Sequence, residues 1–193
     1  MKRFCDIVLS FVGLLILSPL FLAVACWIKA DSSGPVFYRQ TRVGKGNRDF
    51  TILKFRTMYT NSDRRGLLTV GGRDSRVTRA GYFLRKYKID ELPQLWNVLK
   101  GDMSFVGPRP EVKKYVGLYS KEQLHVLDVR PGITDAASIK YRNENDLLSQ
   151  AKDPEKYYIE AIMPDKLAIN LHYVDNHSLW GDLRLVLLTL KAI

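Results

Sequence analysis

Cysteine and histidine are scarce in this chain of 193 residues, which holds two of the first and three of the second. Cys5 and Cys26 flank or lie inside one apolar segment, so they can neither frame a zinc site nor cross-link a soluble fold. His125, His172 and His177 show no metal-ligand spacing, and we assign them no role. The sequence therefore excludes a zinc site and a disulfide framework, and the cysteines are expected to be apolar filler.

The common nucleotide-binding loops are also missing. Gly44-Lys45-Gly46 lacks the spacing of a Walker loop, and no GxGxxG pattern follows a strand-like segment. Internal repeats, low-complexity tracts and linkers rich in proline or serine are absent as well. The chain is therefore expected to form one folded unit that is neither a P-loop protein nor a dinucleotide-binding protein.

Acidic residues are outnumbered, because 20 Asp and Glu face 30 Lys and Arg, which gives a net charge of +10. Hydrophobic residues make up 46% and charged residues 26%, as is typical of a folded protein rather than a disordered one. The charge lies almost entirely outside the apolar segment. The polar remainder is expected to meet an anionic partner: nucleic acid, acidic lipid headgroups or a phosphorylated substrate.

The chain does contain a long apolar run, from Ile7 to Ile28. Fourteen of its twenty-two residues are Leu, Ile, Val or Phe, so membrane insertion is favoured by roughly 4 to 8 kcal/mol. Lys2 and Arg3 precede the run as in a secretory signal, but the run is longer than a signal core and has no Ala-x-Ala exit. We therefore expect this segment to enter the bilayer.

Two topologies fit this segment. A straight helix of this length measures about 33 Å, enough to cross a hydrocarbon core of roughly 30 Å. Ser18-Pro19 lies near the middle, however, where proline removes a backbone hydrogen bond, and both flanks carry basic residues that favour the cytoplasmic side. A re-entrant helix-break-helix satisfies both features, whereas kinked spanning helices with proline are also common. The residues alone leave both topologies open.

The next part of the chain predicts a small β-hairpin followed by two helices. Turn-forming glycines separate two strand-like segments, and threonine, proline and glycine supply helix start and stop signals. The expected elements are strands at 36–43 and 48–58 around a turn at 44–47, a loop ending at Gly71-Gly72, a helix from Thr78 to Lys86, and a helix from Leu92-Pro93 to just before Gly101.

Two segments rich in proline and glycine punctuate the second half. Residues 106–110 and 130–134 are expected to be rigid turns, with a helix through 111–128 between them. The C-terminal third is predicted to be helical, and its last helix, near 182–192, either lies in the membrane interface or packs on the domain. The predicted fold class is α+β and mainly helical, with a membrane segment at 1–30, a small β-hairpin, and a helical domain at 31–193 with interfacial helices.

The segment 85–94 carries the clearest chemical signal. Asp90 and Glu91 occupy a turn among basic residues, just before a helix. Such acids often serve only as helix caps, because the helix dipole favours anions there. Adjacent carboxylates ringed by cations can instead divide two tasks, one attacking phosphorus and the other holding a metal. Arg109, fixed between two prolines, is likewise either part of a structural turn or a bidentate phosphate ligand.

Seven strings occur in order along the chain, and each is weak by itself: Lys2-Arg3-x-x-Asp6, Ser18-Pro19, 34–40 (GPVFYRQ), 54–58 (KFRTM), 90–94 (DELPQ), 101–104 (GDMS) and 106–110 (VGPRP). Together they resemble the bacterial sugar transferase family, the monotopic phosphoglycosyl transferases that begin the assembly of O-antigen, capsule, exopolysaccharide and glycoprotein glycans. The match covers most of the chain and weakens after Asn145.

The resemblance implies an enzyme that moves a sugar 1-phosphate from a UDP-sugar to polyprenyl (undecaprenyl) phosphate and releases UMP. It implies that Asp90 is the catalytic nucleophile, that Glu91 is catalytic and a ligand of Mg²⁺, and that Ser18 and Pro19 break a re-entrant helix. The protein would then contact phospholipid at the cytoplasmic face of the bacterial inner membrane and bind no nucleic acid. Cations expected to bind the substrate phosphates are Lys54, Arg56, Arg85, Arg109 and Arg142.

One segment departs from the family pattern. After Pro131–Thr134 many relatives continue with glycine, an apolar residue and Ala-Gln, whereas this chain continues with residues 135–144 (DAASIKYRNE). The catalytic pair is untouched, but the placement of Arg142 and the identity of the sugar stay open. Two other functions compete: a membrane-tethered basic module that binds anionic lipid or nucleic acid, and an enzyme that transfers the bare sugar and releases UDP.

Overall fold

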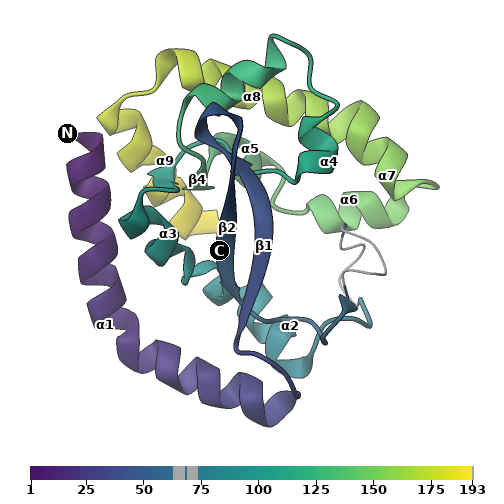
Figure 1. Ribbon diagram of the computed structural model, residues 1–193. Coiled ribbons are helices and arrows are strands. Elements are labelled where there is room, and N and C mark those ends of the chain that lie inside the picture. Colours follow the sequence, from purple (N-terminus) through teal and green to yellow (C-terminus); the bar gives the residue numbers. More distant parts are fainter. Residues whose placement is uncertain (63–67, 69–73, 193) are drawn as a thin grey trace.

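The computed structural model describes residues 1–62, 68 and 74–192; the expected loop end at Gly71-Gly72 lies outside them. Within these residues, α1 (Lys2–Asp31) is the one helix long and apolar enough to cross a membrane. It is continuous but bends near its middle and runs along one side of the molecule (Figure 1). The expected break is therefore a bend inside one helix, not a gap between two.

Ser18 and Pro19 explain how this bend keeps its hydrogen bonds. Pro19 lies inside α1 and has no N–H to donate to the carbonyl of Leu15. The hydroxyl of Ser18 donates to that carbonyl instead, at 2.8 Å. The serine thereby satisfies an acceptor that would otherwise be costly to leave unpaired in lipid.

The first turns of α1 are fastened to the rest of the domain. Arg3 donates hydrogen bonds to the carbonyls of Val98 (2.6 Å) and Leu99 (2.9 Å), where a cation also suits the C-terminal end of a helix. Asp6 is buried and accepts hydrogen bonds from the Ser104 hydroxyl (3.1 Å) and the Phe105 amide (3.2 Å). Arg3 and Asp6, which belong to the Lys2-Arg3-x-x-Asp6 string, therefore both hold the start of α1 on the domain.

The other end of α1 is fastened to the same domain. Asp31 accepts a hydrogen bond from the amide of Ala80 at 3.0 Å. The buried guanidinium of Arg56 donates to the carbonyls of Ser32 (2.7 Å) and Ser33. Both ends of the apolar helix therefore contact one folded body.

The predicted hairpin is confirmed. Its strands pair antiparallel over their full length, with Phe37 opposite Phe55 and Gly44 opposite Arg48. Gly46 (φ 66°) and Asn47 (φ 58°) adopt the left-handed conformation that the turn requires. The elements are β1 (Phe37–Gly44), the 3₁₀ turn η1 (Lys45–Asn47) and β2 (Arg48–Phe55).

The two helices predicted after the hairpin are also confirmed. Thr78 caps the first by accepting a hydrogen bond from the amide of Gly81 at 3.0 Å, and Gly101 (φ 100°) ends the second. A Cβ on Gly81 would lie 2.0 Å from the carbonyl oxygen of Thr57, so glycine lets this helix rest directly on the chain after β2. The elements are α2 (Arg79–Lys86), the 3₁₀ turn η3 (Ile89–Glu91) and α3 (Gln94–Lys100).

The prediction of rigid turns at 106–110 and 130–134 is partly wrong. The strands β3 (Ser104–Val106) and β4 (Gly132–Thr134) form a short parallel pair, with Ser104 opposite Gly132. A Cβ on Gly132 would lie 2.1 Å from the amide nitrogen of Gly107. Two glycines therefore allow the backbones to meet, and strands this short have no periodicity to reveal them.

The single helix predicted through 111–128 is wrong as well. The structure has α4 (Lys113–Val116) and, after an interruption, the 3₁₀ helix η4 (Gln123–Asp128). Ser120 and Gln123 explain the new start: the Ser120 hydroxyl accepts from the Gln123 amide (3.2 Å), and the Gln123 side chain accepts from the Ser120 amide (2.9 Å). This reciprocal cap ends one helical segment and begins another.

The C-terminal third is helical, as predicted. Its last helix begins at Leu179, three residues before the expected start. A core cluster that includes Val126, Leu148 and Ile162 holds this part together. The elements are α5 (Ala136–Lys140), α6 (Glu144–Gln150), α7 (Pro154–Tyr157), the π turn η5 (Tyr158–Ile162), α8 (Met163–Asn176) and α9 (Leu179–Ala192).

A second core cluster connects the apolar helix to the acidic turn. Val24 and Ile28 from α1 pack against Phe55 and Leu84, and Ile89 packs against the same cluster. Ile89 is the first residue of η3, which also contains Asp90 and Glu91. The predicted α+β, mainly helical class is confirmed, and the C-terminal half of α1 lies directly beneath the acidic turn.

Candidate active site

The acidic turn is built by the way α2 ends. Lys88 adopts the left-handed conformation (φ 55°), and its amide donates to the carbonyl of Arg85 at 3.2 Å. The chain then enters η3, where the Glu91 amide donates to the Lys88 carbonyl. A non-glycine residue in this conformation is strained by roughly 1–2 kcal/mol. The strained turn buries both Asp90 (8% exposed) and Glu91 (9% exposed).

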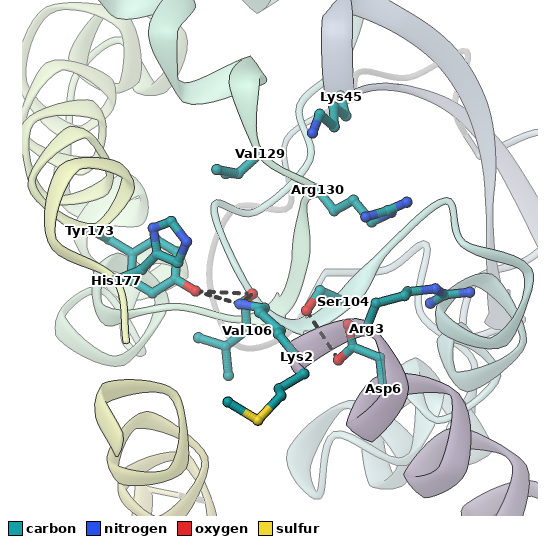
Figure 2. Close-up of a pocket in the computed structure, with 11 residues that line it drawn as sticks. Lys2, Arg3, Asp6, Lys45, Ser104, Val106, Val129, Arg130, Tyr173 and His177 are labelled. Atoms are coloured by element: carbon teal, nitrogen blue, oxygen red, sulfur yellow. Dashed lines mark hydrogen bonds between the residues drawn. The ribbon is translucent and has the colours of Figure 1, made fainter. Parts of the chain in front are cut away.

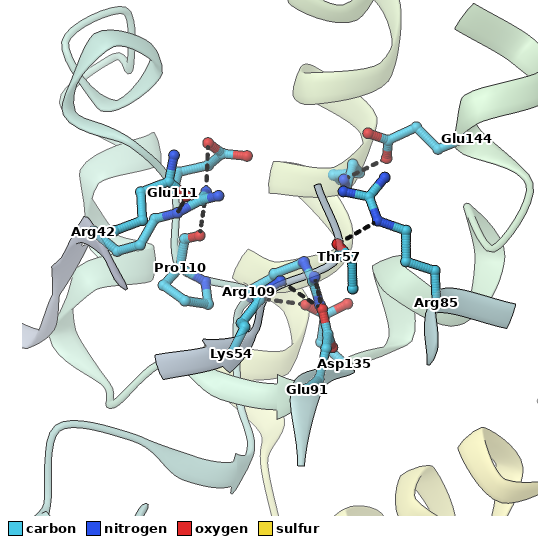
Figure 3. A network of polar contacts seen from close by, with 12 residues as sticks. Arg42, Lys54, Thr57, Arg85, Glu91, Arg109, Pro110, Glu111, Asp135 and Glu144 are labelled. Carbon is cyan, nitrogen blue, oxygen red and sulfur yellow. Dashed lines mark hydrogen bonds and ion pairs between the residues drawn. The ribbon is translucent and has the colours of Figure 1, made fainter. Parts of the chain in front are cut away.

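Glu91 is held by two cations from different elements. The ammonium of Lys54, on β2, lies 2.7 Å from Glu91 Oε1. The guanidinium of Arg109 contacts both carboxylate oxygens, with Nη1 at 3.2 Å from Oε2 and Nη2 paired with Oε1. Figure 3 shows the side chains of Lys54 and Arg109 meeting at Glu91. Burial raises the pKa of Glu91, but Arg109 and Lys54 outweigh it and hold the pKa well below its usual value.

Asp90 has a different environment although it is the adjacent residue. Burial and the charge of Glu91 raise the pKa of Asp90 to about 6, against the opposing pull of Lys54 and Arg85. Among the hydrogen bonds of the described residues, none is donated to its carboxylate. Two neighbouring acids with pKa values pushed apart are the arrangement expected when each has its own chemical task.

Arg109 is fixed through its backbone as well as its side chain. Its amide donates to Asp135 Oδ2 at 2.7 Å, and Asp135 Oδ1 caps α5 by accepting from the Ser138 amide. The Glu91 charge raises the pKa of Arg109, so the guanidinium is permanently charged. The Pro108-Arg109-Pro110 segment follows β3 directly, so pairing with β4 also sets its course.

Lys54 takes its place from the hairpin, which Asn97 of α3 braces. Asn97 Oδ1 accepts from the Leu53 amide at 3.0 Å, and its Nδ2 donates to the Thr51 carbonyl at 2.7 Å. Burial lowers the pKa of Lys54, although the neighbouring Glu91 opposes that shift. The brace thus fixes the strand residue that contacts Glu91.

The other three predicted phosphate ligands lie in different places. Arg85 is near the acidic turn: its Nε donates to the Thr57 hydroxyl at 2.9 Å, and its charge lowers the pKa of Asp90. The Arg56 guanidinium instead contacts the end of α1 at Ser32 and Ser33. Arg142 is exposed in the turn between α5 and α6. The structure therefore brings together Lys54, Arg85 and Arg109, but not Arg56.

Two residues with a positioning role were not predicted. Asp135 holds the Arg109 backbone and Asn97 holds the strand that carries Lys54. Asp135 precedes a short helix, so its sequence position indicated a cap but not the second contact with Arg109. Asn97 lies inside a helix, where no local pattern marks a polar brace.

Comparison with known proteins identifies the family of this chain. The model of the bacterial sugar transferase family matches residues 1–193. The UDP-N-acetylgalactosamine-undecaprenyl-phosphate N-acetylgalactosaminephosphotransferase of Aeromonas hydrophila is 42% identical over all of this chain, which covers 43% of that protein. The UDP-glucose:undecaprenyl-phosphate glucose-1-phosphate transferase of Caulobacter vibrioides is 38% identical, with 100% of this chain and 69% of the relative covered.

A protein of Xanthomonas campestris with the same glucose-1-phosphate transferase name is 39% identical over 97% of this chain. The chain spans 37% of that relative, so it corresponds to less than half of some relatives and to most of others. The whole-chain family match and these identities are supported by the order of the seven sequence strings. The chain belongs to the bacterial sugar transferase family.

Proposed function

We propose that this chain transfers a sugar 1-phosphate from a UDP-sugar to undecaprenyl phosphate and releases UMP, as the first step of a bacterial surface glycan or glycoprotein glycan. The observation that carries this proposal is the difference in surroundings between the two adjacent acids of η3, Asp90 and Glu91. Asp90 is buried, and its carboxylate accepts no hydrogen bond from the described residues. Glu91 is held between Lys54 and Arg109. The relatives' names supply the substrate class.

The chemistry would run in two displacements at one phosphorus. An oxygen of Asp90 attacks the phosphorus that bears the sugar, the bond from that phosphorus to the bridging oxygen breaks, and UMP leaves with the electron pair. An oxygen of the carrier phosphate then attacks the same phosphorus and frees the Asp90 carboxylate. Attack by an anion on an anionic diphosphate requires nearby positive charge, which Lys54, Arg85 and Arg109 provide.

Magnesium fits this site through few protein ligands. No cluster of three or more His, Cys, Asp or Glu residues suited to a metal occurs in the described part of the chain. Mg²⁺ commonly binds one or two carboxylates together with substrate phosphates and water, and Asp90 and Glu91 supply two carboxylates. Glu91 would hold the ion, which would neutralise charge on the diphosphate. Lys54 and Arg109, which now neutralise Glu91, would be free to bind phosphate oxygens.

We propose that α1 is re-entrant at the cytoplasmic face of the inner membrane, and the attachment of both its ends supports the re-entrant part of this proposal. Its first turn contacts α3 and β3 through Arg3 and Asp6, and its last turn contacts α2 through Asp31. A helix that crossed a bilayer would place its ends on opposite sides, about 30 Å apart. One domain fastened to both ends would instead hold them on the same side, and the bend at Ser18-Pro19 is compatible with that arrangement.

The decisive experiment identifies the nucleotide product and the covalent intermediate. Purified protein is incubated with Mg²⁺ and a panel of UDP-sugars, each labelled at the phosphorus that bears the sugar. We expect release of UMP and label bound to the protein before carrier is added, and loss of that label on addition of undecaprenyl phosphate. Release of UDP would show transfer of the bare sugar, and release of no nucleotide with any sugar would contradict the proposal.

The variant Asp90→Asn tests the nucleophile. We expect it to fold and insert but to release no UMP and to take up no label. Asp146→Asn is the matched control, because Asp146 is an exposed aspartate at the start of α6. Full turnover in Asp90→Asn would eliminate the covalent mechanism.

A further inference from the structure

A cavity of about 290 Å³ is lined by neither Asp90 nor Glu91; Figure 2 shows the residues around it. It is lined by the start of α1, the hairpin tip, the segment just before β4 and the end of α8. The strand β3 contributes Ser104 and Val106 to its wall. The volume is close to the lower end of the roughly 300–1,000 Å³ that hold small ligands. None of the residues that contact Glu91 lines it.

The cavity carries an excess of positive charge. Lys2, Arg3, Lys45 and Arg130 line it, against one carboxylate, Asp6. That carboxylate already accepts hydrogen bonds from the Ser104 hydroxyl and the Phe105 amide. The ammonium of Lys2 forms an ion pair with Asp182 Oδ2 at 2.7 Å, and Asp182 does not line the cavity. Neither of these two carboxylates balances the charges of Arg3, Lys45 and Arg130.

Two of these cations contact only neutral carbonyls among the described residues. Arg3 donates to carbonyls at the end of α3, and Arg130 donates through Nε to the carbonyl of Gly101 at 2.9 Å. These bonds hold the guanidinium groups in place without cancelling their charge. Lys45 is exposed at the hairpin tip, and no carboxylate of the described residues pairs with it. Two positioned guanidinium groups and the exposed ammonium of Lys45 therefore give the cavity wall a positive charge that no described carboxylate cancels.

The cavity borders exposed apolar surface that would face lipid in the topology proposed above, and the inference rests on that topology. Phe4 follows Arg3 on α1 and is 71% exposed, and Trp180, three residues after the cavity-lining His177, is 82% exposed. Tryptophan favours the headgroup region of bilayers. Val106 and Val129 supply apolar wall inside the cavity. Phosphate chemistry beside apolar surface matches the head of an anionic lipid better than it matches a free phosphate ion.

We propose that this cavity binds the phosphate of an anionic membrane phospholipid, as a lipid site separate from the catalytic acids. The lipid phosphate lies among Arg3, Lys45 and Arg130, and its glycerol carbons lie against the valines. Occupancy ties the start of α1, the hairpin tip and the segment before β4 to one lipid molecule. The site is independent of the reaction proposed above, because it shares none of the residues that contact Glu91.

The test compares two double variants of the full chain in a neutral detergent. Lys45→Ala with Arg130→Ala removes two cavity cations, and Lys152→Ala with Lys156→Ala removes two exposed cations near α7. Short-chain phosphatidylglycerol, phosphatidylcholine and inorganic phosphate are titrated separately, and bound lipid is counted by native mass spectrometry. We expect one phosphatidylglycerol per chain, bound at least tenfold more weakly by the cavity variant and unchanged in the control.

Three results would overturn the proposal. Equal weakening in both double variants would mean that charge attracts lipid without a site. Equal binding of phosphatidylcholine would mean that the anionic head is not recognised. Displacement of the lipid by inorganic phosphate at equal concentration would identify a free phosphate site instead. Release of UMP by the control variant, measured in parallel, reports on the catalytic proposal separately.

Discussion

Asp90 and Glu91 are joined by one peptide bond, yet their carboxylates experience opposite electrostatic surroundings. Lys54 and Arg109 stabilise the ionised form of Glu91, whereas burial and that same ionised neighbour favour the protonated form of Asp90. A carboxylate with a raised pKa is a better nucleophile, and one with a lowered pKa is a more dependable anion for a metal. The division of tasks therefore follows from position rather than from residue type.

This difference predicts the acid side of the pH profile. Attack requires ionised Asp90, whose pKa is about 6. Below that value, kcat/KM for UMP release should fall about tenfold per pH unit. Initial rates from pH 5 to 8 at fixed Mg²⁺ test this. A rate that stays flat down to pH 5 would contradict the prediction.

The same shift predicts a stability effect of opposite sign to the usual case for an acid. Because the folded protein holds the pKa of Asp90 above the ordinary value of 3.8, the fold loses stability as pH rises from about 3.8 to about 6. The Asp90→Asn variant has no carboxyl group to ionise at this position, so it does not lose stability in this way. We therefore expect the variant to be more stable than the parent at pH 7, with a smaller difference at pH 5, as measured by denaturant unfolding in detergent.

Glu91→Gln removes the negative charge between Lys54 and Arg109. Two partly buried cations then lose their partner, and breaking such a pair costs roughly 3–5 kcal/mol. We expect a lower unfolding midpoint, weaker dependence of UMP release on Mg²⁺ and an acid limb moved to lower pH, because Asp90 loses its repulsive neighbour. An unchanged Mg²⁺ titration would remove Glu91 as a metal ligand.

Asp135 separates a positioning role from a capping role. Asp135→Asn keeps an oxygen to accept the Ser138 amide, but its amide group opposes the donor of Arg109. Asp135→Ala loses both contacts and about 1 kcal/mol of capping. We expect both variants to raise KM for the UDP-sugar, whereas only Asp135→Ala should lower the unfolding midpoint appreciably. Parent-like KM in Asp135→Asn would mean that Asp135 is only a cap.

Elements were predictable where a local signal decided them. The hairpin, α2 and α3 follow from Gly46, Thr78 and Gly101, each of which acts on its own segment. The β3–β4 pair was not predictable, because it depends on contact between glycines far apart in the chain. The same limit applies to the site: the acidic pair and Arg109 were recognisable, but Asn97 and Asp135 act through contacts that only the fold creates.

One position at the start of α1 and one in the hairpin that follows it give the element-scale prediction. Single cysteines replacing Lys2 or Lys45, in a chain with Cys5 and Cys26 changed to serine, should both react with a membrane-impermeant reagent from the cytoplasmic side. Both native cysteines are exposed, so they must be removed first. Labelling from opposite sides would establish a spanning helix and exclude the re-entrant topology.

Across the whole molecule, exposed tryptophans on three helices indicate how it meets the bilayer. Trp27 on α1, Trp96 on α3 and Trp180 on α9 are 42%, 54% and 82% exposed. In single-tryptophan variants placed in lipid nanodiscs, we expect each to be quenched more strongly by bromine near the headgroups than by bromine at the chain ends. An unquenched Trp180 would show that the start of α9 faces water and does not touch lipid.

In the proposed re-entrant topology, fastening α1 at both of its ends would also decide how the protein meets its lipid carrier. The domain cannot tilt away from the bilayer without breaking the contacts of Arg3, Asp6 and Asp31. The packing of Ile89 on Val24 and Ile28 then keeps Asp90 at constant depth. The proposed carrier, confined to the same leaflet, would then reach Asp90 by lateral diffusion alone, so the encounter would be a search in two dimensions.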